Sequence, residues 1–282
     1  MFKILQKRKL NDSMTLMVVD APFIAKKAKA GEFIILRVNE QGERIPLTIA
    51  DYDREKGTVT IIYQIVGKTT MLLDQLNEGD AILDFIGPLG KATELEGYKK
   101  AAVIGGGAGC AIAYPQSKAL FAQGTHVDMI AGFRNKDIII LEDEMRAACN
   151  NLTIMTDDGS NGNKGFVTDA LRKNIENGAN YDLVVAIGPL VMMRAVCNLT
   201  KEYGIKTIIS MNPIMIDGTG MCGGCRLTVG GKTKFACVDG PDFDGHEVDF
   251  DEAIKRSKTY AEMEREAAHD YKCHLMEGAD HA

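Results

Sequence analysis

The 282-residue chain contains no tryptophan, only five histidines and no run of 18 consecutive apolar residues. The absence of such a run argues against a membrane-spanning helix. The first ten residues, MFKILQKRKL, lack the apolar core of a signal peptide, so we expect none. The net charge is −6 without a concentrated basic patch, which argues against nucleic acid as a partner.

Cysteine occurs seven times, an odd number that a complete disulfide framework would not use. Three cysteines fall in one motif, which fits a reducing compartment better, and we expect a cytoplasmic protein. The motif runs from Asp217 through Cys222 and Cys225 to Cys237. It has the C-x4-C-x2-C…C spacing of plant-type ferredoxins, with Asp217 in place of the first cysteine.

This spacing predicts a [2Fe–2S] cluster with Asp217, Cys222, Cys225 and Cys237 as its ligands, because ferric iron accepts a carboxylate oxygen as well as sulfur. Such a cluster would move single electrons. A structural Zn²⁺ is an alternative, since three cysteines and an aspartate can form a tetrahedral site. Zinc ribbons use two CxxC pairs, however, and this chain has one. A loop without metal is the third possibility.

The hydrophobic pattern divides the chain into four parts. Residues 1–98 contain short alternating or β-branched runs between turn signals, which predict an antiparallel β-barrel. Residues 99–212 alternate buried-strand runs with helical segments five times, which predicts a doubly wound α/β domain with a parallel sheet. Residues 213–245 form the cluster module. Residues 246–282 form a helical tail, read as one surface helix with a sparse apolar stripe at Phe250, Ile254 and Tyr260.

A glycine-rich turn follows the first strand run of the α/β part. It consists of Gly105, Gly106, Gly107, Ala108 and Gly109. A strand that opens through glycines onto a helix can hold a pyrophosphate, because bare backbone and unpaired N–H groups face the anion. The match to G-x-G-x-x-G is imperfect, since Cys110 occupies the third glycine position. A tight turn with small residues for packing is the alternative interpretation.

Two motifs in the barrel could bind another phosphate-containing ligand. Arg44 and Thr48 can grip a phosphate and a ring edge, and Gly67 begins a Gly-Lys-Thr-Thr helix start. Each is weak alone, because an arginine on a barrel rim is usually solvated and paired threonines usually cap a helix.

The order of these motifs resembles the ferredoxin–NADP reductase superfamily over residues 1–245. Within it, the chain looks similar to the electron-transfer subunits of heterodimeric dihydroorotate dehydrogenases and their relatives. That branch has cysteine at the position of Asp217 and ends soon after the D-G-P-x-F loop, which is residues 239–243 here. The aspartate and the tail resemble instead the small subunits of NADH-dependent reduced ferredoxin:NADP oxidoreductases, called sulfide dehydrogenases in some related sequences. We favour this second branch, with the dihydroorotate branch as the alternative.

The resemblance implies the site residues. FAD would bind in the barrel, NAD(H) at the glycine turn and its rim, and the cluster at the ligands already named, with the loop of residues 239–243 near the flavin. The implied FAD contacts are Arg44, Pro46, Leu47, Thr48, Ile62, Tyr63, Gln64, Gly67, Thr69 and Thr70. The implied NAD(H) contacts are Gly105, Gly106, Gly107, Ala108, Gly109, Asp157, Asp158 and Gly188.

The resemblance also implies the chemistry and the partners. FAD converts a two-electron hydride from NADH into single electrons for the cluster, so no catalytic acid, base or nucleophile is expected. The expected partners are NADH, a larger flavin/iron–sulfur subunit and, through that complex, ferredoxin. For the choice between NAD and NADP, Arg134 and Lys136 favour a 2′-phosphate, whereas Asp128, about twenty residues beyond the glycines, favours a free ribose. A zinc-stabilised nucleotide-binding regulator without redox activity is the rival class.

Overall fold

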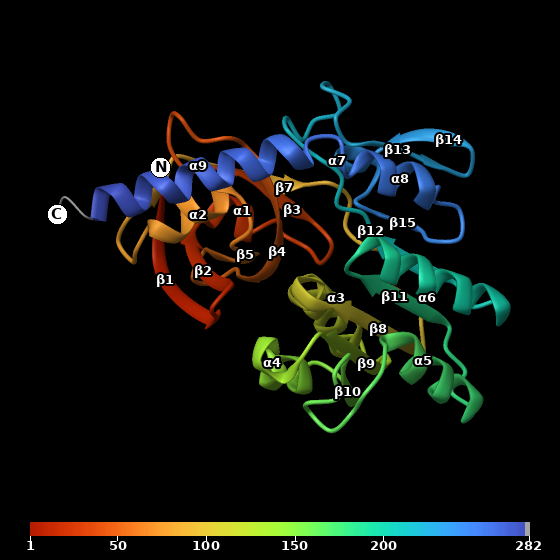
Figure 1. Cartoon of the computed structure of the whole chain (residues 1–282). Helices are drawn as coiled ribbons and strands as arrows, with labels where there is room; N and C mark the ends of the chain where they lie inside the picture. The colour runs from red at the N-terminus through yellow and green to blue at the C-terminus, as the bar shows by residue number, and fades with distance from the viewer. Residues whose placement is uncertain (280–282) are drawn as a thin grey trace.

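The computed structural model describes residues 1–279, and their side chains except those of Lys272 and residues 274–279. The chain forms a β-barrel, an α/β domain and a cluster module, and a long C-terminal helix runs back across the barrel (Figure 1). The expected fold class, a barrel followed by a parallel-sheet α/β domain, is confirmed. The domain boundaries at residues 98, 212 and 245 stay a prediction.

The barrel is a seven-stranded antiparallel sheet in the order β6-β1-β2-β5-β4-β3-β7. Side chains of β2 and β5 alternate between buried and half-buried positions, as expected for strands with one face on a core. The two outer strands, β6 and β7, are consecutive in the chain, so the sheet nearly closes on itself. The strands are β1 (Phe2–Asn11), β2 (Met14–Asp20), β3 (Phe33–Arg37), β4 (Ile45–Asp53), β5 (Thr58–Gln64), β6 (Ala81–Ile82) and β7 (Asp84–Leu89), with helices α1 (Pro22–Ala25) and α2 (Lys68–Gln75).

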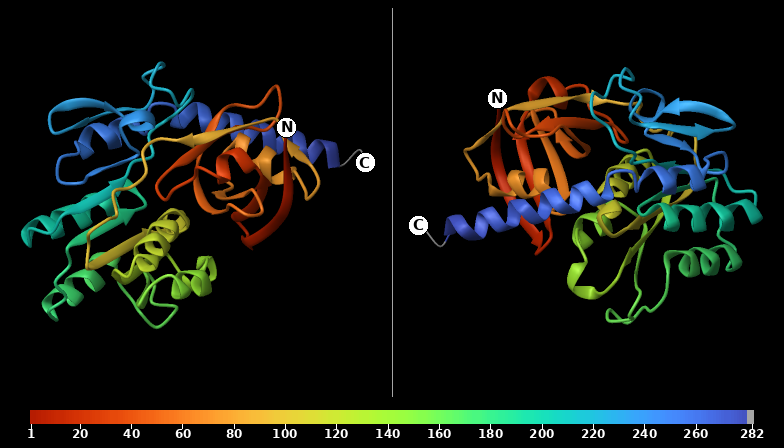
Figure 2. Two further views of the ribbon diagram at one scale, coloured as in Figure 1. Left: turned by 180° about the vertical axis from the view of Figure 1, so that it is seen from behind. Right: turned by 45° about the horizontal axis from the view of Figure 1, so that its top comes forward.

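The second sheet has the order β10-β9-β8-β11-β12-β15, with the first five strands parallel and β15 antiparallel at the edge. Helices α3 and α4 cover one face, and α5 and α6 cover the other (Figure 2). The elements are β8 (Lys100–Gly106), η1 (Gly107–Gly109), α3 (Cys110–Ala122), β9 (His126–Phe133), η2 (Lys136–Ile138), α4 (Glu142–Ala147), β10 (Asn151–Thr156), α5 (Val167–Glu176), β11 (Leu183–Ile187), α6 (Leu190–Glu202) and β12 (Thr207–Ser210).

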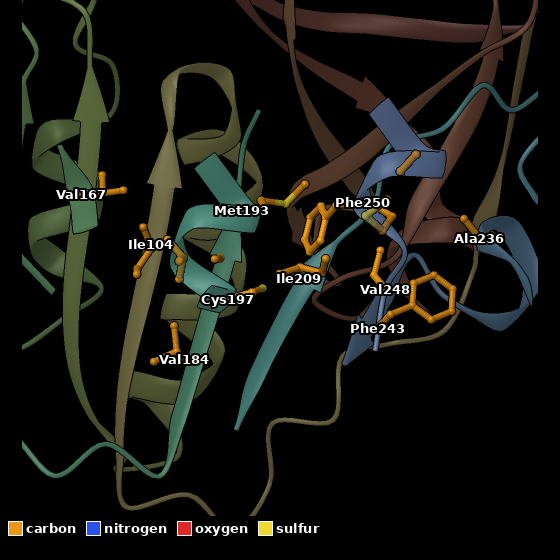
Figure 3. Packing of buried hydrophobic residues seen from close by; sticks show 14 of the residues in the cluster. Ile104, Val167, Val184, Met193, Cys197, Ile209, Ala236, Phe243, Val248 and Phe250 are labelled. Carbon is orange, nitrogen blue, oxygen red and sulfur yellow. The ribbon is translucent and has the colours of Figure 1, made fainter. Parts of the chain in front are cut away.

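The cluster module completes this sheet rather than standing apart. Its elements are β13 (Arg226–Val229), β14 (Lys232–Phe235), α7 (Ala236–Asp239) and β15 (Asp242–Asp244), which pairs with β12. One hydrophobic core joins Ile209 of the sheet to Phe243 and Val248 (Figure 3). Cys225 and Cys237 lie in the same core. Two of the four predicted cluster ligands are therefore anchored to the α/β sheet.

The prediction of one continuous surface helix after residue 248 is wrong. The tail forms two helices, α8 (Phe250–Arg256) and α9 (Ala261–Ala279). Helix α8 packs on α6 and β13, with Phe250 only 8% exposed. Helix α9 lies along α2 of the barrel, where the Tyr271 hydroxyl donates to Gln75 Oε1 over 3.1 Å. Of the predicted apolar stripe, only Phe250 enters the core, whereas Ile254 is half-buried and Tyr260 is 49% exposed.

Among residues 1–279, no helix combines the length and the apolar character needed to cross a membrane.

Candidate cofactor sites

The predicted flavin segment lies on β4, beside β3. Thr48 pairs with Phe33 and Pro46 with Ile35 across the two strands. Arg44, just before β4, and residues 45–48 are all half-buried, so their side chains stay within reach of a ligand. The structure thus brings Arg44, Pro46, Leu47 and Thr48 together on one strand end, without showing what they bind.

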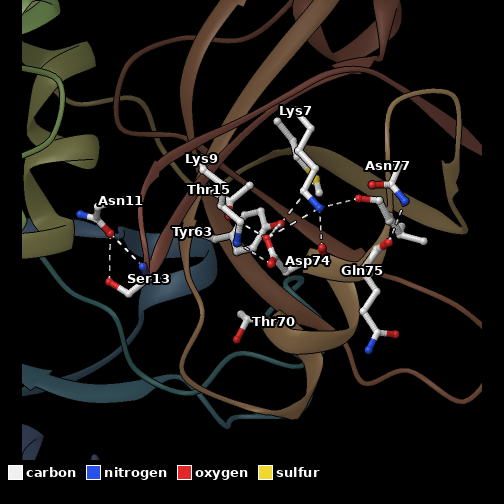
Figure 4. A network of polar contacts seen from close by, with 12 residues as sticks. Lys7, Lys9, Asn11, Ser13, Thr15, Tyr63, Thr70, Asp74, Gln75 and Asn77 are labelled. Carbon is white, nitrogen blue, oxygen red and sulfur yellow. Dashed lines mark hydrogen bonds and ion pairs between the residues drawn. The ribbon is translucent and has the colours of Figure 1, made fainter. Parts of the chain in front are cut away.

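Neighbouring side chains of β5 point in opposite directions. Ile62 is half-buried and Gln64 exposed, whereas Tyr63 is 2% exposed. The Tyr63 hydroxyl lies 3.3 Å from Asp74 Oδ1, which also accepts from Thr15 (Figure 4). Burial first, and then the Asp74 charge, raises the pKa of Tyr63. The Tyr63 ring therefore lies inside the barrel, which corrects the prediction that this side chain lines a flavin. Only the Tyr63 backbone is left to contact a ligand.

The Gly-Lys-Thr-Thr sequence does start a helix, with Gly67 at the N-cap of α2. The Thr70 hydroxyl accepts hydrogen bonds from the amides of Val66 and Gly67, both over 3.0 Å, and donates to Gly67 O over 2.9 Å. Thr69 donates to Glu43 over 3.4 Å. Thr70 is thus occupied by capping, and the first-turn amides are what this helix offers to an anion.

The glycine-rich turn joins β8 to α3 through η1. A Cβ on Gly109 would lie 2.3 Å from Ile187 O, and one on Gly106 would lie 2.4 Å from Met192 Sδ. Close packing therefore explains these two glycines. Gly107 differs, because its φ is +54° and nothing lies within 4 Å of a Cβ there. Packing thus accounts for Gly106 and Gly109, whereas phosphate binding at this turn stays a prediction, for which Gly107 leaves open backbone.

The other predicted NAD(H) contacts lie at the same edge of the sheet as this turn. Gly188 follows β11, and its Cβ position lies 3.2 Å from the Gly106 backbone. Asp157 and Asp158 follow β10 and are exposed. Hydrogen bonds from Ser160 hold the pKa of Asp158 below its usual range. The carboxyl ends of parallel strands are where such sheets bind ligands, so the grouping fits a dinucleotide site.

Asp128 does not belong to that site. It lies near the start of β9, opposite Ala102 and Asn151, at the amino edge of the sheet. Its carboxylate accepts from Tyr181 over 2.8 Å and from Asn151 over 2.7 Å. The suggestion that Asp128 reads a ribose is therefore wrong, because the residue is satisfied at the other end of the strand.

The cluster loop is seated on the barrel. A Cβ on Gly218 would lie 2.7 Å from Ile35 Cδ1 of β3. Asp217 Oδ1 accepts from the Thr219 amide over 2.5 Å, and Oδ2 accepts from the Cys222 amide over 2.7 Å. Bonds from Thr219 and then Cys222 hold the pKa of Asp217 well below its usual range. Asp217 is thus a carboxylate tied directly to the next predicted ligand.

Cys225 and Cys237 form a second pair. Their Sγ atoms lie 3.2 Å apart, and both residues are free thiols at least 98% buried. Burial, and then Cys225, raises the pKa of Cys237 to about 12. Cys222 is exposed. The four predicted ligands therefore lie in one loop system as two pairs.

The pairs fit a two-iron cluster better than a single metal ion. In the described part of the chain, no three His, Cys, Asp or Glu side chains lie close enough to hold one ion. Structural zinc sites take four protein ligands around one ion, whereas a [2Fe–2S] cluster takes four ligands shared over two irons. Cys225 and Cys237, whose Sγ atoms lie 3.2 Å apart, match the second requirement for one iron, and the Asp217 carboxylate is hydrogen-bonded to the Cys222 amide.

Sequence reasoning missed a buried polar contact where the barrel, α3 and β15 meet. The Asp242 carboxylate accepts from Thr93, which follows the barrel, and from Gln116 of α3 over 2.9 Å. Lys91 N also donates to Gly240 O over 2.6 Å. The D-G-P-D-F motif marked this loop, but nothing local in the sequence indicated that the Asp242 carboxylate is buried.

Two family models match the chain. One is an oxidoreductase NAD-binding domain over residues 103–198, and the other is the iron–sulfur cluster binding domain of dihydroorotate dehydrogenase B over residues 212–249. The "dihydroorotate dehydrogenase B (NAD(+)), electron transfer subunit homolog" of Thermotoga maritima is 44% identical over 263 residues, covering 93% of each chain. The chain belongs to the dihydroorotate dehydrogenase B electron transfer subunit family.

One further relative and one solved structure are also similar to this chain. The electron transfer subunit of Fusobacterium nucleatum is 32% identical over 83% of this chain and 92% of its own. The solved structure of an NADH-dependent reduced ferredoxin-NADP oxidoreductase, studied for flavin-based electron bifurcation, is 41% identical. It covers 95% of this chain and 96% of its own, with a TM-score of 0.91.

The chain is therefore an oxidoreductase subunit for electron transfer, with NAD(H), FAD and an iron–sulfur cluster as its cofactors. This confirms the predicted family, activity and cofactors and excludes the redox-inactive zinc protein. The individual binding residues stay a prediction.

Proposed function

We propose that the chain is the small subunit of an NADH-dependent reduced ferredoxin:NADP oxidoreductase and works in the cytoplasm with a larger flavin/iron–sulfur subunit. The observation that carries this is the match of 41% identity and TM-score 0.91 over 95% of the chain to the oxidoreductase of that type. Identity alone does not separate the two branches, because the dihydroorotate-type homolog of Thermotoga maritima is 44% identical and the Fusobacterium subunit 32%. Asp217 and the two tail helices support the same branch. All seven cysteines are free, which suits a reducing compartment.

Asp217, Cys222, Cys225 and Cys237 would hold a [2Fe–2S] cluster. FAD, when bound, would supply the chemistry that converts the two-electron hydride of NADH into single electrons for the cluster. Burial of Cys225 and Cys237 keeps water from half of the ligand set, and the Thr219 and Cys222 amides keep the Asp217 carboxylate ionised.

The barrel residues would hold and orient the flavin. Arg44 and Thr48 supply polar contacts along β4, and the first-turn amides of α2 face the pyrophosphate. Gly107, with its open φ > 0 position, and the rim at Asp157, Asp158 and Gly188 would receive NAD(H). No side chain needs to exchange a proton in this scheme.

The exposed side of the cluster loop would face the larger subunit. Met221 is 89% exposed and Ile216 is 52% exposed, on either side of Asp217 and next to the exposed Cys222. Exposed apolar side chains beside a redox centre suit a docking surface, because electrons must leave over a short distance. Ferredoxin would then be reached through the complex.

The alternative is an electron-transfer subunit for dihydroorotate dehydrogenase, which the matched cluster-domain model favours by its description. Purification of the chain from its native host, without oxygen, distinguishes the two. We expect a larger flavin/iron–sulfur protein to co-purify, with about one FAD and two irons per small subunit. Co-purification of a dihydroorotate-oxidising subunit would establish the alternative, and zinc in place of iron would contradict both.

A further inference from the structure

The two glycines between Cys222 and Cys225 are each held by an arginine. Arg226 Nη1 donates to Gly223 O over 3.2 Å, and Arg256 Nη2 donates to Gly224 O over 3.1 Å. Arg226 is a close neighbour in the sequence, but Arg256 lies 32 residues from Gly224, at the end of α8. The tail thus reaches directly onto the loop between two predicted ligands.

Helix α8 is firmly anchored, so the position of Arg256 is well determined. The Asp249 side chain caps the helix by accepting from Glu252 N over 2.9 Å. Thr228 of β13 donates its amide to Glu252 over 2.9 Å and accepts from Asp249 N over 3.0 Å. Phe250 and Ala253 are each 8% exposed. These contacts fix the helix on the same hairpin that follows the CxxC loop.

Among the side chains that the structure describes, no carboxylate lies within ion-pair distance of Arg256. The nearest acidic residues of its helix are used elsewhere, because Asp251 pairs with Arg194 and Glu252 binds Thr228. The half-buried guanidinium beside the loop therefore has no carboxylate partner among the described side chains. A reduced iron–sulfur cluster carries one more negative charge than an oxidised one, so this cation favours reduction.

The hydrogen bond also sets the direction of an amide. In a trans peptide the C=O and N–H groups point to opposite sides. The neighbouring peptide shows the consequence, since Arg226 holds Gly223 O while Gly224 N–H points at Cys222 Sγ, 3.5 Å away. In the same way, Arg256 holds Gly224 O and directs the Cys225 N–H away from the guanidinium. Amide hydrogen bonds to cluster sulfurs raise the reduction potential.

We propose that Arg256 is a positioning residue for the iron–sulfur cluster, which fixes the Gly224–Cys225 peptide and raises the reduction potential of the cluster. This proposal rests on the proposed ligand set. It gives the tail a role inside the electron-transfer unit, in addition to any contact with a partner.

The test uses the full chain purified without oxygen and a redox titration followed by the EPR signal of the reduced cluster. Arg256→Gln should lower the ratio of reduced to oxidised cluster about tenfold at the wild-type midpoint, equivalent to about 59 mV for one electron. Arg256→Lys keeps the charge but loses the planar fork, and should lower the ratio about threefold. Lys255→Gln, which removes an exposed neighbouring charge, should change it less than about twofold.

Equal shifts in Arg256→Gln and Lys255→Gln would overturn the proposal, because charge alone would explain them. A lower melting temperature without a potential shift would also overturn it, since Arg256 would then serve stability only. If the Arg256→Gln protein contains no cluster, the Arg256→Lys protein provides the test. An unchanged reduction potential in Arg256→Lys would then contradict the proposal. A wild-type protein without a [2Fe–2S] signal would instead contradict the proposed ligand set itself.

Discussion

Gln116 Nε2 donates to Asp242 Oδ2 over 2.9 Å, while Gln116 Oε1 and Asp242 Oδ1 are buried without a partner among the described residues. Both unpaired oxygens are acceptors as long as Asp242 is ionised. A proton on the carboxyl group supplies the missing donor. Burial raises the pKa of Asp242 to about 6, against the opposing effect of hydrogen bonds from Ser210, Thr93 and Gln116.

This raised pKa predicts a stability that depends on pH. Because the folded state holds the proton more tightly, the stabilisation is complete below pH 3.8 and is lost as the pH rises through about 6. Asp242→Asn removes the titration and can donate to Gln116. The unfolding free energy of Asp242→Asn, relative to wild type, should therefore rise by about 1–1.5 kcal/mol between pH 5 and pH 8 in urea titrations.

The control for Asp242 is Asp20→Asn, which changes an exposed carboxylate at the end of β2. Its stability relative to wild type should stay constant over the same pH range. A constant difference for Asp242→Asn as well would show that the buried carboxyl group does not titrate there.

Asp217 is expected to be an iron ligand, so its replacement should change the cluster without removing it. Asp217→Cys restores the four-cysteine set and should keep about two irons per chain while changing the EPR g-values and the potential. Asp217→Ala should lower the iron content. Asp244→Cys, at the exposed last residue of β15, is the matched control and should leave the spectrum unchanged. An unchanged spectrum in Asp217→Cys would mean that the carboxylate does not touch iron.

Arg44 and Thr48 are predicted to bind FAD non-covalently through β4. Loss of one charge-assisted hydrogen bond costs about 1.5–3 kcal/mol, so Arg44→Ala should weaken FAD binding by about one to two decades, and Thr48→Ala by about one. FAD retained through gel filtration and measured dissociation constants check this. Arg265→Ala, on exposed α9, should bind FAD like wild type. Stoichiometric FAD in both barrel variants would contradict the site.

Unlike Arg44 and Thr48, Tyr63 is not expected to bind FAD through its side chain, because its ring is buried. Tyr63→Phe removes the hydroxyl that faces Asp74 inside the barrel. It should lower the unfolding free energy by about 1 kcal/mol and leave FAD binding unchanged. A loss of FAD in this variant, measured by the same gel filtration, would place the ring at the flavin after all.

The tail contains a buried segment around Phe250 and an exposed helix, α9. Phe250→Ala should cost about 3 kcal/mol of stability, because the side chain is buried against the sheet and the cluster module. Met263→Ala, 66% exposed on α9, should cost less than about 0.5 kcal/mol. Truncation after Thr259 should therefore keep the cluster, whereas truncation after His246 should not. Similar losses in Phe250→Ala and Met263→Ala, by urea unfolding, would contradict this division.

Local pattern predicted the fold well, because period and turn residues suffice for regular elements. The run at residues 126–131 lies within β9 (His126–Phe133), and the segment at 111–122 lies within α3 (Cys110–Ala122). The break between α8 and α9 has no glycine or proline to announce it, so the tail was read as one helix. The break depends on the hydrophobic core around Phe250. That core is built from segments far away in the sequence.

The site was predictable only where a motif carries it. The spacing of Cys222, Cys225 and Cys237 is local, and the matching family model covers those residues. Asp128 was misplaced because its distance from the glycines along the chain says nothing about which end of β9 it occupies. Asp242 and Arg256 act through contacts 126 and 32 residues apart, and no local pattern reports such contacts.

The central claim, that this chain passes electrons from NADH through FAD to a [2Fe–2S] cluster, is tested most directly by NADH titration of the purified chain without oxygen. Flavin absorbance and the low-temperature EPR signal are followed together. The account predicts flavin bleaching and a [2Fe–2S] signal that approaches about one spin per chain with a strong reductant. Full bleaching by NADH with no [2Fe–2S] signal even under dithionite would contradict it.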